Sequence, residues 1–161
     1  MGLSTKALTV RSGKTSLPGT SSVNEPVGLL DTNVFIHAQT NDSLSDECRR
    51  FMLALESGVV QAVLDPIVLH EVSYALPRYV KQMTRDDVAA YMIVIVGLDG
   101  VISNKGVLVD AIERWRDTPG LAFVDAYLAA MASDRGCAVY SKNVRELQGQ
   151  GVPVPNPLPA G

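Results

Sequence analysis

Cysteine, aromatic residues and long apolar runs are all scarce in this chain. Its two cysteines, Cys48 and Cys137, have no CxxC spacing and no neighbouring histidines that would indicate zinc or a redox pair. We expect both to be buried, reduced thiols. The apolar run at residues 91–98 is much shorter than the ~20 residues that cross a bilayer. No apolar block of a secretory signal is present near the start, so we expect a cytoplasmic protein without membrane spans.

An excess of basic residues is also missing. The chain has 14 Lys and Arg against 17 Asp and Glu, a net charge of −3 and a pI near 5.3. Nucleic-acid binders usually display a positive surface, so this balance does not by itself indicate one. However, acids gathered in one pocket can hold divalent cations and leave local bases to meet phosphates. The bases available for this are Arg78, Lys81, Arg85, Arg114, Arg116, Lys142 and Arg145.

The length and composition fit one globular domain with a short leader. The 161 residues are 47% hydrophobic, which is enough to build one substantial core. Residues 1–25 are rich in Ser, Thr and Gly and predict a flexible leader or tag. We place the domain at residues 26–158 and a tail at 159–161.

Apolar runs alternate with helical patterns along this domain. Such alternation predicts an α/β fold in which right-handed crossovers place the strands in one parallel sheet. We expect three layers, with a short central sheet flanked by helices. The expected strands cover residues 27–31, 59–66, 100–103 and 137–141, with a possible edge strand at 152–155.

The sequence also predicts where several helices begin and end. Ser43-x-x-Asp46 and Thr84-x-x-Asp87 resemble capping boxes, which start helices. Pro77 is expected to disturb the later turns of the helix that begins near Ile67. Further helices are expected over the NKGVLVDAIERWRD and FVDAYLAAMASDRG segments, which are followed by a short turn at NVRELQGQG.

Three carboxylates occupy positions that suggest chemistry. Asp31 directly follows an apolar run, so a bound cation would relieve the cost of placing its charge at the edge of a core. Glu71 borders the apolar stripe of its helix, and Asp125 lies among apolar residues. Reactive groups in parallel sheets lie at the carboxyl ends of strands, where Asp31 and Ser141 both fall. Such carboxylates can converge on Mg²⁺ or Mn²⁺.

Each carboxylate also has an ordinary structural explanation. Asp31 is equally suited to cap the next helix. Glu71 is a residue type that is usually solvated on a helix surface, and Asp125 would be favourably placed near the dipole of its helix's first turn. The spacing by itself leaves these alternatives open.

Four segments together resemble a known family, the PIN-domain nucleases, and particularly the VapC-type toxins of bacterial toxin–antitoxin pairs. LLDTNVFI, HEVSYAL and FVDAYLAAMA are similar to the family's first three motifs, with Asp31, Glu71 and Asp125 at their acidic positions. YSKNVRELQGQGVPVPNPL is similar to its closing segment. The resemblance covers roughly residues 27–158.

The closing segment departs from the most acidic version of the family pattern. Asn143 stands where the family often has Asp, and Glu146 stands in place of the usual second Asp. The resemblance implies that Asp31, Glu71, Asp125 and Asn143 are catalytic residues and that Glu146 joins them as a metal ligand. The alternative is that Asn143 caps a short helix and Glu146 completes a capping box.

The resemblance implies a metal-dependent endoribonuclease that uses Mg²⁺ or Mn²⁺ to position a water and stabilise the charge of phosphodiester cleavage. It further implies an RNA substrate, a cognate antitoxin protein and a homodimer. His37 and His70 are not needed by the family pattern, and we expect both to have structural roles.

Other functional classes fit the sequence less well. A phosphoacceptor domain would want a further acidic pair near GLLDTN, and a haloacid-type phosphatase would want Asp where Asn33 stands. The stronger competitor is a PIN fold that binds RNA or a protein without cutting, which the neutral Asn143 makes plausible.

Overall fold

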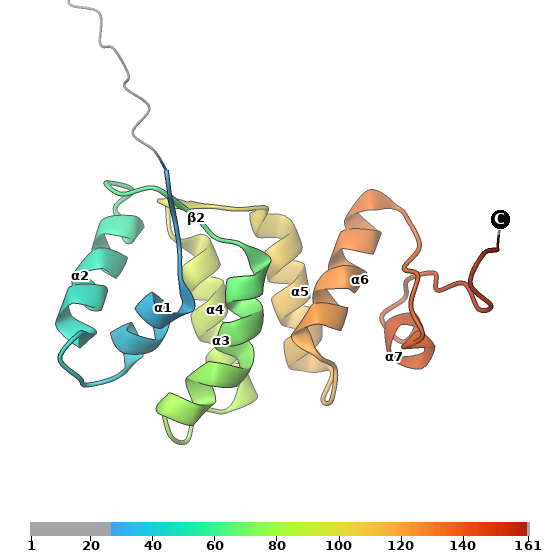
Figure 1. The fold of residues 1–161 in the computed structure, drawn as a ribbon, viewed down its shortest axis with the longest axis horizontal. Helices are drawn as coiled ribbons and strands as arrows, with labels where there is room; N and C mark the ends of the chain where they lie inside the picture. Colours follow the sequence, from blue (N-terminus) through green and yellow to red (C-terminus); the bar gives the residue numbers. More distant parts are fainter. Residues whose placement is uncertain (1–26, 161) are drawn as a thin grey trace, which may run out of the picture.

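The computed structural model describes residues 27–160, and the expected leader therefore lies outside the described residues. The predicted α/β class is confirmed: helices pack against a short parallel sheet, which lies along the upper edge of the view in Figure 1. The predicted domain limits stay a prediction. In chain order the elements are β1 (Gly28–Leu29), α1 (Thr32–Gln39), α2 (Ser45–Glu56), β2 (Ala62–Val63), α3 (Pro66–Tyr79), α4 (Arg85–Gly97), β3 (Val101–Ile102), α5 (Lys105–Asp117), α6 (Phe123–Arg135) and α7 (Val144–Gln148).

The sheet has the strand order β1-β2-β3, and both pairings are parallel. Gly28 lies opposite Ala62, which in turn lies opposite Val101. The backbone N–H of Leu30 continues the β1 ladder by donating to the carbonyl oxygen of Val63 at 3.0 Å. Since β2 is central, β1 forms one edge of the sheet, and Asp31 leaves the sheet at the carboxyl end of that edge strand.

Local capping explains where two of the helices begin. The Asp65 carboxylate accepts a hydrogen bond from the Ile67 N–H at 2.9 Å, and Pro66 occupies the first turn of α3, where a missing N–H costs nothing. The predicted capping box of α4 is confirmed, because Thr84 and Asp87 bond reciprocally. Pro77 lies inside α3 but does not end it there.

The start of α2 differs from the sequence prediction. The expected Ser43-x-x-Asp46 capping box is wrong, because the helix begins at Ser45 and its cap residue Leu44 offers no side-chain acceptor. Asp42 organises the turn instead: its carboxylate accepts from the Leu44 N–H at 2.8 Å, while its own N–H donates to the Ser45 hydroxyl at 2.9 Å. An aspartate that bonds its own backbone two residues on is a common way to build such a turn.

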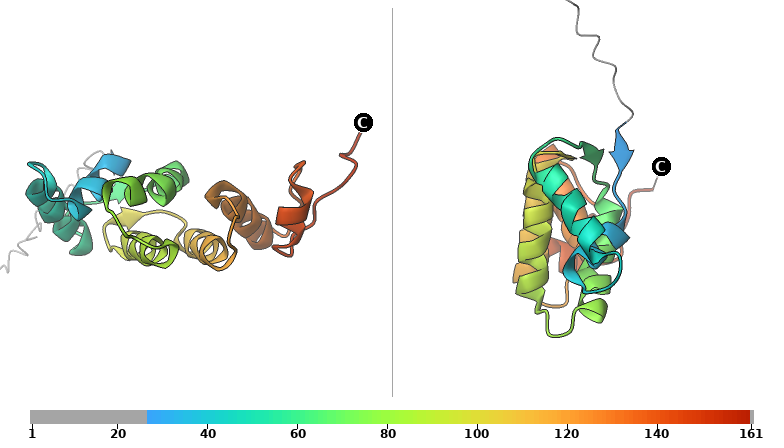
Figure 2. Two further views of the ribbon diagram at one scale, coloured as in Figure 1. Left: turned by 90° about the horizontal axis from the view of Figure 1, so that it is seen from below. Right: turned by 90° about the vertical axis from the view of Figure 1, so that its left-hand side faces the viewer.

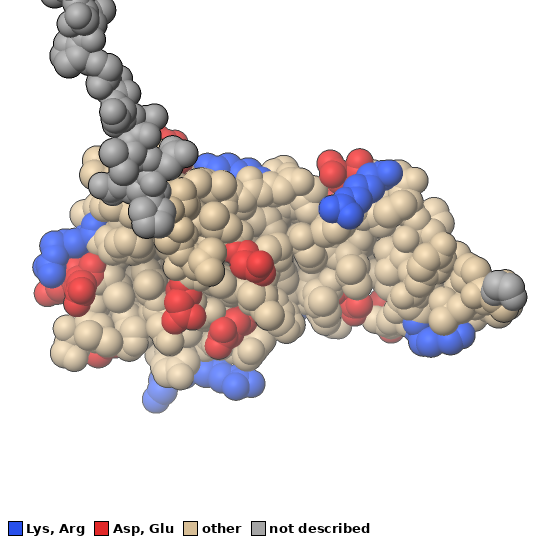
Figure 3. Space-filling view, turned by 45° about the horizontal axis from the view of Figure 1, so that its top comes forward, with Lys and Arg blue, Asp and Glu red and all other residues tan. Residues whose placement is uncertain are grey.

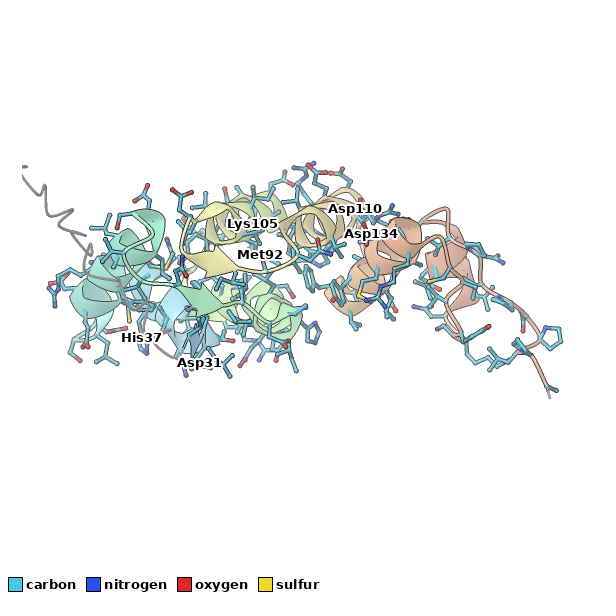
Figure 4. All side chains as sticks on the ribbon, turned by 90° about the horizontal axis from the view of Figure 1, so that it is seen from above. Asp31, His37, Met92, Lys105, Asp110 and Asp134 are labelled. Carbon is cyan, nitrogen blue, oxygen red and sulfur yellow. The ribbon has the colours of Figure 1, made fainter. Side chains whose placement is uncertain are left out.

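The main hydrophobic core lies between the sheet and helices α1, α3, α4 and α5. Phe35, Leu69 and Met92 are fully buried in it, and Met92 lies near its centre in Figure 4. A second, smaller cluster lies beyond α6 and is built from Ala129, Ala132, Val139, Leu147, Val152 and Val154. We call residues 132–160, which supply most of this cluster, the distal region.

The expected strands at residues 137–141 and 152–155 are wrong, because the structure assigns neither segment to a strand. The Val139 N–H donates to the Pro153 carbonyl at 2.9 Å, which links the two segments to each other. The physical reason is the path of the chain: α6 packs on α5 and carries the distal region away from β1 (Figures 1 and 2). With no sheet neighbour, an apolar run does not become a strand.

Two further predictions concern single features. Cys48 is half-buried, but Cys137 is exposed, so the expectation of a buried thiol is wrong at Cys137, which lies outside the main core. No helix within residues 27–160 has the length and apolar character to span a membrane.

Candidate active site

Asp31 lies at the exposed junction between β1 and α1. Its extended backbone precedes the helix, yet its carboxylate makes no capping hydrogen bond to the helix amides. The carboxylate instead accepts from the side-chain amide of Asn33 at 3.0 Å. The Asp31 side chain therefore does not cap α1, and Asp31 is exposed to solvent.

Glu71 is held beside this junction by a buried hydroxyl. The Thr32 Oγ1 donates to Glu71 Oε2 at 2.8 Å, and Thr32 is only 2% exposed. The bond joins α1 to α3 and fixes the Glu71 carboxylate next to Thr32, the residue that follows Asp31. Thr32 was not predicted as a site residue, although its position directly after Asp31 in the LLDTNVFI motif was an available signal.

Asp125 and Asn143 form a second polar pair. Asp125 lies in the first turn of α6, where the helix dipole favours a negative charge. Its Oδ2 accepts from the Asn143 side-chain amide at 2.7 Å. The Asn143 backbone N–H donates to Ser141 Oγ at 2.9 Å, which shapes the turn that presents this side chain. The structure thus connects the third and fourth sequence motifs.

The capping alternative for the fourth motif is not what the structure shows. Asn143 occupies the cap position of α7 but makes no side-chain capping bond, because its amide is directed to Asp125. Glu146 is exposed on α7, and no hydrogen bond of its carboxylate is found among the described residues. The metal-ligand role of Glu146 stays a prediction.

The two polar pairs do not form one metal site within a single chain. Across residues 27–160, no group of three or more His, Cys, Asp or Glu side chains is placed to hold an ion. Oxygen donors of this kind suit Mg²⁺ or Mn²⁺, but the placement supplies two pairs rather than one cluster. The convergence of Asp31, Glu71 and Asp125 is therefore not present in this structure.

A cleft of about 410 Å³ lies between α3 and α6. None of Asp31, Glu71, Asp125 and Asn143 lines this cleft, although Glu71 and Asp125 directly follow the lining residues His70 and Val124 in the sequence. Its walls are mainly apolar. The lining residues are Asp65, Pro66, Ile67, His70, Phe123, Val124 and Tyr127.

His37 and His70 each contact another side chain of the protein. His37 Nδ1 lies 2.7 Å from Asp42 Oδ2, on the side of the molecule that also carries Asp31 (Figure 4). The Thr40 hydroxyl, the His37 ring and the Leu44 N–H all bond the Asp42 carboxylate and hold its pKa far below its usual range. His70 packs edge-on against Tyr74 with ring centroids 5.4 Å apart.

The face seen in Figure 3 carries no continuous basic surface. Lys and Arg side chains lie there in small separate groups near the margins, and acidic side chains gather nearer the middle. This agrees with the net charge of −3. A polyanion on this face would meet separate bases rather than a positive groove.

Comparison with known families decides the assignment. The sequence profile of the PIN domain matches residues 28–145. The chain belongs to the PIN domain family. The match spans Asp31, Glu71, Asp125 and Asn143, and it ends just before Glu146. PIN domains are generally metal-dependent nucleases, and family membership indicates nuclease-type activity and RNA binding. Searches of curated proteins and of solved structures returned no match.

Proposed function

We propose that this PIN domain is a divalent-metal-dependent endoribonuclease of the VapC type, acting in the cytoplasm as the toxin of a type II toxin–antitoxin pair. The observation that carries the proposal is the pairing of the four motif positions. Glu71 is hydrogen-bonded to Thr32, the residue after Asp31, and Asp125 is hydrogen-bonded to Asn143. Solvated or capping side chains would not need these dedicated partners.

Each residue has a stated role in the proposal. Asp31, Glu71 and Asp125 would hold Mg²⁺ or Mn²⁺, with Asn143 and Glu146 as the further candidates for its ligand shell. The ion would supply an activated water and charge stabilisation at the phosphate. Thr32 and Asn143 keep two of the carboxylates oriented before any ion arrives. Orientation in advance lowers the cost of assembling the ligand set.

The test is cleavage of purified total RNA by the purified full chain with Mg²⁺ or Mn²⁺, followed by mapping of the new ends. We expect discrete internal cuts that disappear with a chelator. Asp31→Asn and Asp125→Asn should abolish them, because a neutral amide holds a divalent cation less strongly. Asp134→Asn is the matched control, since Asp134 is an exposed carboxylate on α6 that lies well away from Asp31 in Figure 4.

A second candidate function is a PIN fold that binds RNA or protein without cutting. It is favoured by the separation of the two pairs and by the Asn143 amide, whose nitrogen and not its oxygen faces Asp125. Metal-independent RNA binding without cleavage, unchanged by Asp31→Asn, would establish this alternative and remove the nuclease proposal.

The proposed antitoxin and homodimer need separate tests. A short reading frame next to this one would identify the candidate antitoxin. Its product should co-purify with the chain and suppress the RNA cuts. Light scattering of the purified chain would give the oligomeric state.

A further inference from the structure

The cleft between α3 and α6 is a candidate binding site that the proposed metal chemistry does not use. Its volume of about 410 Å³ falls within the range of sites that hold small molecules. The Ile67 side chain on its α3 wall is 68% exposed, and the Val124 side chain on its α6 wall is 46% exposed. Apolar walls that face solvent in a cleft are typical of a site whose ligand covers them.

Aromatic rings from both helices line the cleft. They belong to His70, Phe123 and Tyr127. The Phe123 ring is held edge-on against Trp115 at 6.4 Å, and the His70 ring is held edge-on against Tyr74 at 5.4 Å. Rings that are fixed in place can receive a flat ligand, and nucleobases stack on such side chains. The shape and lining of the cleft therefore suit a nucleobase.

The charge of the lining favours a neutral ligand that donates hydrogen bonds. The described residues that line the cleft include one carboxylate, Asp65, and no Lys or Arg. A phosphate group in the cleft would be repelled by this carboxylate and would find no base to pair with. Asp65 Oδ1 accepts from the Ile67 N–H at 2.9 Å, but a carboxylate has further acceptor positions on both oxygens. These positions can accept N–H groups of a bound base.

His70 supplies a second polar group. Its Nδ1 is buried and has no hydrogen-bond partner among residues 27–160. Buried polar atoms nearly always have a partner, and an exception is explained if a ligand provides one. Because His70 lines the cleft, a ligand that enters the cleft is placed to do so. The Asp65 carboxylate and the His70 ring can therefore recognise one ligand together.

The cleft is also close in sequence to two of the proposed metal ligands. Glu71 directly follows His70, and Asp125 directly follows Val124. Consecutive Cα atoms are ~3.8 Å apart. A nucleotide whose phosphate is bound at either carboxylate therefore has the cleft within reach of its base.

We propose that this cleft binds a guanine base of the RNA substrate and selects a guanosine beside the bond that is cut. Guanine presents two neighbouring donors, N1–H and the 2-amino group, which match the two oxygens of the Asp65 carboxylate. Adenine and cytosine place an acceptor nitrogen beside their amino group, and uracil places its one N–H between two carbonyl oxygens. The inference rests on the proposed nuclease function for its ligand, but binding in the cleft does not require cleavage.

Binding of short RNA by the full chain tests the proposal. The probe is a fluorescently labelled oligouridine with one central guanosine, compared by anisotropy with the same oligomer carrying inosine, which lacks only the 2-amino group. A chelator prevents cutting. The guanosine oligomer should bind about tenfold more tightly, within the range for discrimination by a bidentate contact. Equal affinities would overturn the proposal, and they are the result expected if the cleft holds a protein segment instead of a base.

Two conservative substitutions separate recognition from stability. Asp65→Asn retains the cap of α3, since Asn caps about as well as Asp, but it replaces an acceptor by a donor. It should remove the preference for guanosine over inosine with little change in melting temperature. His70→Phe retains a ring against Tyr74 and should weaken guanosine binding severalfold without lowering the melting temperature, because the nitrogen that it removes has no partner in the free chain. An unchanged preference in Asp65→Asn would overturn the proposal.

A matched pair on α6 tests the place of binding. Val124→Trp should fill the cleft and abolish binding of the guanosine oligomer. Leu128→Trp lies one turn further along α6 at an exposed leucine that does not line the cleft, and it should leave the affinity unchanged. Equal effects of the two substitutions would contradict binding in the cleft.

Mapped RNA ends distinguish this inference from the nuclease proposal. If the chain cuts RNA, its cuts should lie beside guanosines, and this preference should be lost in Asp65→Asn. Cuts without a base preference would overturn the inference and leave the nuclease function in place. Guanosine-selective binding without any metal-dependent cutting would support the cleft and remove the nuclease function.

Discussion

The region from β1 to α5 and the distal region bury their apolar residues in different ways. The first region shares one continuous core, in which α1 packs on α3, α3 on α4 and α4 on α5. The distal region has only a small cluster of its own, joined to the rest through α6 and polar contacts. A short cluster of this kind contributes little cooperative stability by itself. Among the candidate site residues, Asn143 and Glu146 lie in the distal region, which we expect to be the less stable part of the molecule.

The largest expected difference comes from matched core deletions. Leu69 in the main core and Leu147 in the distal cluster are both fully buried. Leu69→Ala should lower the free energy of global unfolding by about 2–5 kcal/mol, through lost burial and a new cavity. Leu147→Ala should mainly release the distal region, with a smaller loss of global stability.

Urea denaturation together with fragment-resolved hydrogen exchange would check this pair. Exchange protection should fall throughout the chain in the Leu69 variant, but mainly in residues 132–160 in the Leu147 variant. Equal losses in both variants, spread over the whole chain, would show that the distal region belongs to the same cooperative unit.

Arg114 should be the strongest polar link between the two regions. Its guanidinium bonds Asp110, the Gln150 carbonyl and Ser133, so it ties α5 to the chain on both sides of α7. Arg114→Ala should reduce the local stability of the distal region by about 1.5–3 kcal/mol, the range for hydrogen bonds to a charged group.

Arg116 provides the comparison on the same helix. It pairs with the neighbouring, exposed Asp117, and such solvent-screened surface pairs contribute little to stability. Hydrogen exchange of residues 144–154 should therefore accelerate in Arg114→Ala and remain unchanged in Arg116→Ala. Similar exchange in the two variants would contradict the assigned role of Arg114.

The hydrogen bond between Asp125 and Asn143 offers a test of metal binding. Asn143→Asp replaces the donating amide by a second carboxylate 18 residues from the first. The two charges should repel and loosen α6 from α7 in the absence of metal. Mn²⁺ should bind about tenfold more tightly, at the lower end of the effects that ligand-shell changes produce.

Glu146→Gln is the companion change. Because Glu146 is exposed and Asn143 is directed at Asp125, we expect only the Asn143 substitution to alter Mn²⁺ affinity in calorimetric titrations. A weaker affinity in Glu146→Gln would restore Glu146 to the ligand set. If neither substitution alters affinity, the fourth position leaves the proposed site.

The hydroxyl of Thr32 should have a smaller effect. Thr32→Val removes the donor to Glu71 at nearly constant volume and should cost about 1 kcal/mol, the usual net contribution of one hydrogen bond. RNA cleavage should fall severalfold because Glu71 loses its fixed orientation. Thr32→Ser retains the hydroxyl and should recover most of the activity, whereas equal losses in both variants would point to packing instead.

The sequence predicted the first region better than the distal one for a physical reason. Helix caps and short apolar runs depend on residues that are close in sequence, as the caps at Asp65 and Thr84 show. Strands β1 to β3 and the helices between them were therefore expected in nearly the right places. Residues 137–141 also have the pattern of a strand, but a strand needs a neighbour that local pattern does not supply. The path of α6 decided that outcome.

The same distinction applies to the candidate site. The four motifs predicted Asp31, Glu71, Asp125 and Asn143. The structure joins Asn143 to Asp125, and it joins Glu71 to Thr32, the residue after Asp31. Among the described residues no group of three carboxylates is placed to hold an ion, so the metal-ligand roles of Asp31, Glu71 and Asp125 stay a prediction. Thr32 was not predicted because a threonine beside an apolar run is usually interpreted as a core residue and not as a hydrogen-bond donor to a site residue.

The smallest expected effect concerns acid stability at the turn between α1 and α2. The pKa of Asp42 is lowered first by the Thr40 hydroxyl, next by the His37 ring and then by the Leu44 N–H. A carboxyl group whose folded pKa lies below its unfolded pKa stabilises the fold fully above the unfolded value of about 4, and this contribution disappears as the pH falls through the folded value. Asp42→Asn should therefore flatten the decline of stability below about pH 4 in urea melts. Thr40→Val should flatten it more than His37→Ala, because the hydroxyl is the larger cause. A steeper decline in Asp42→Asn than in the wild-type chain would show that the sign of this linkage is wrong.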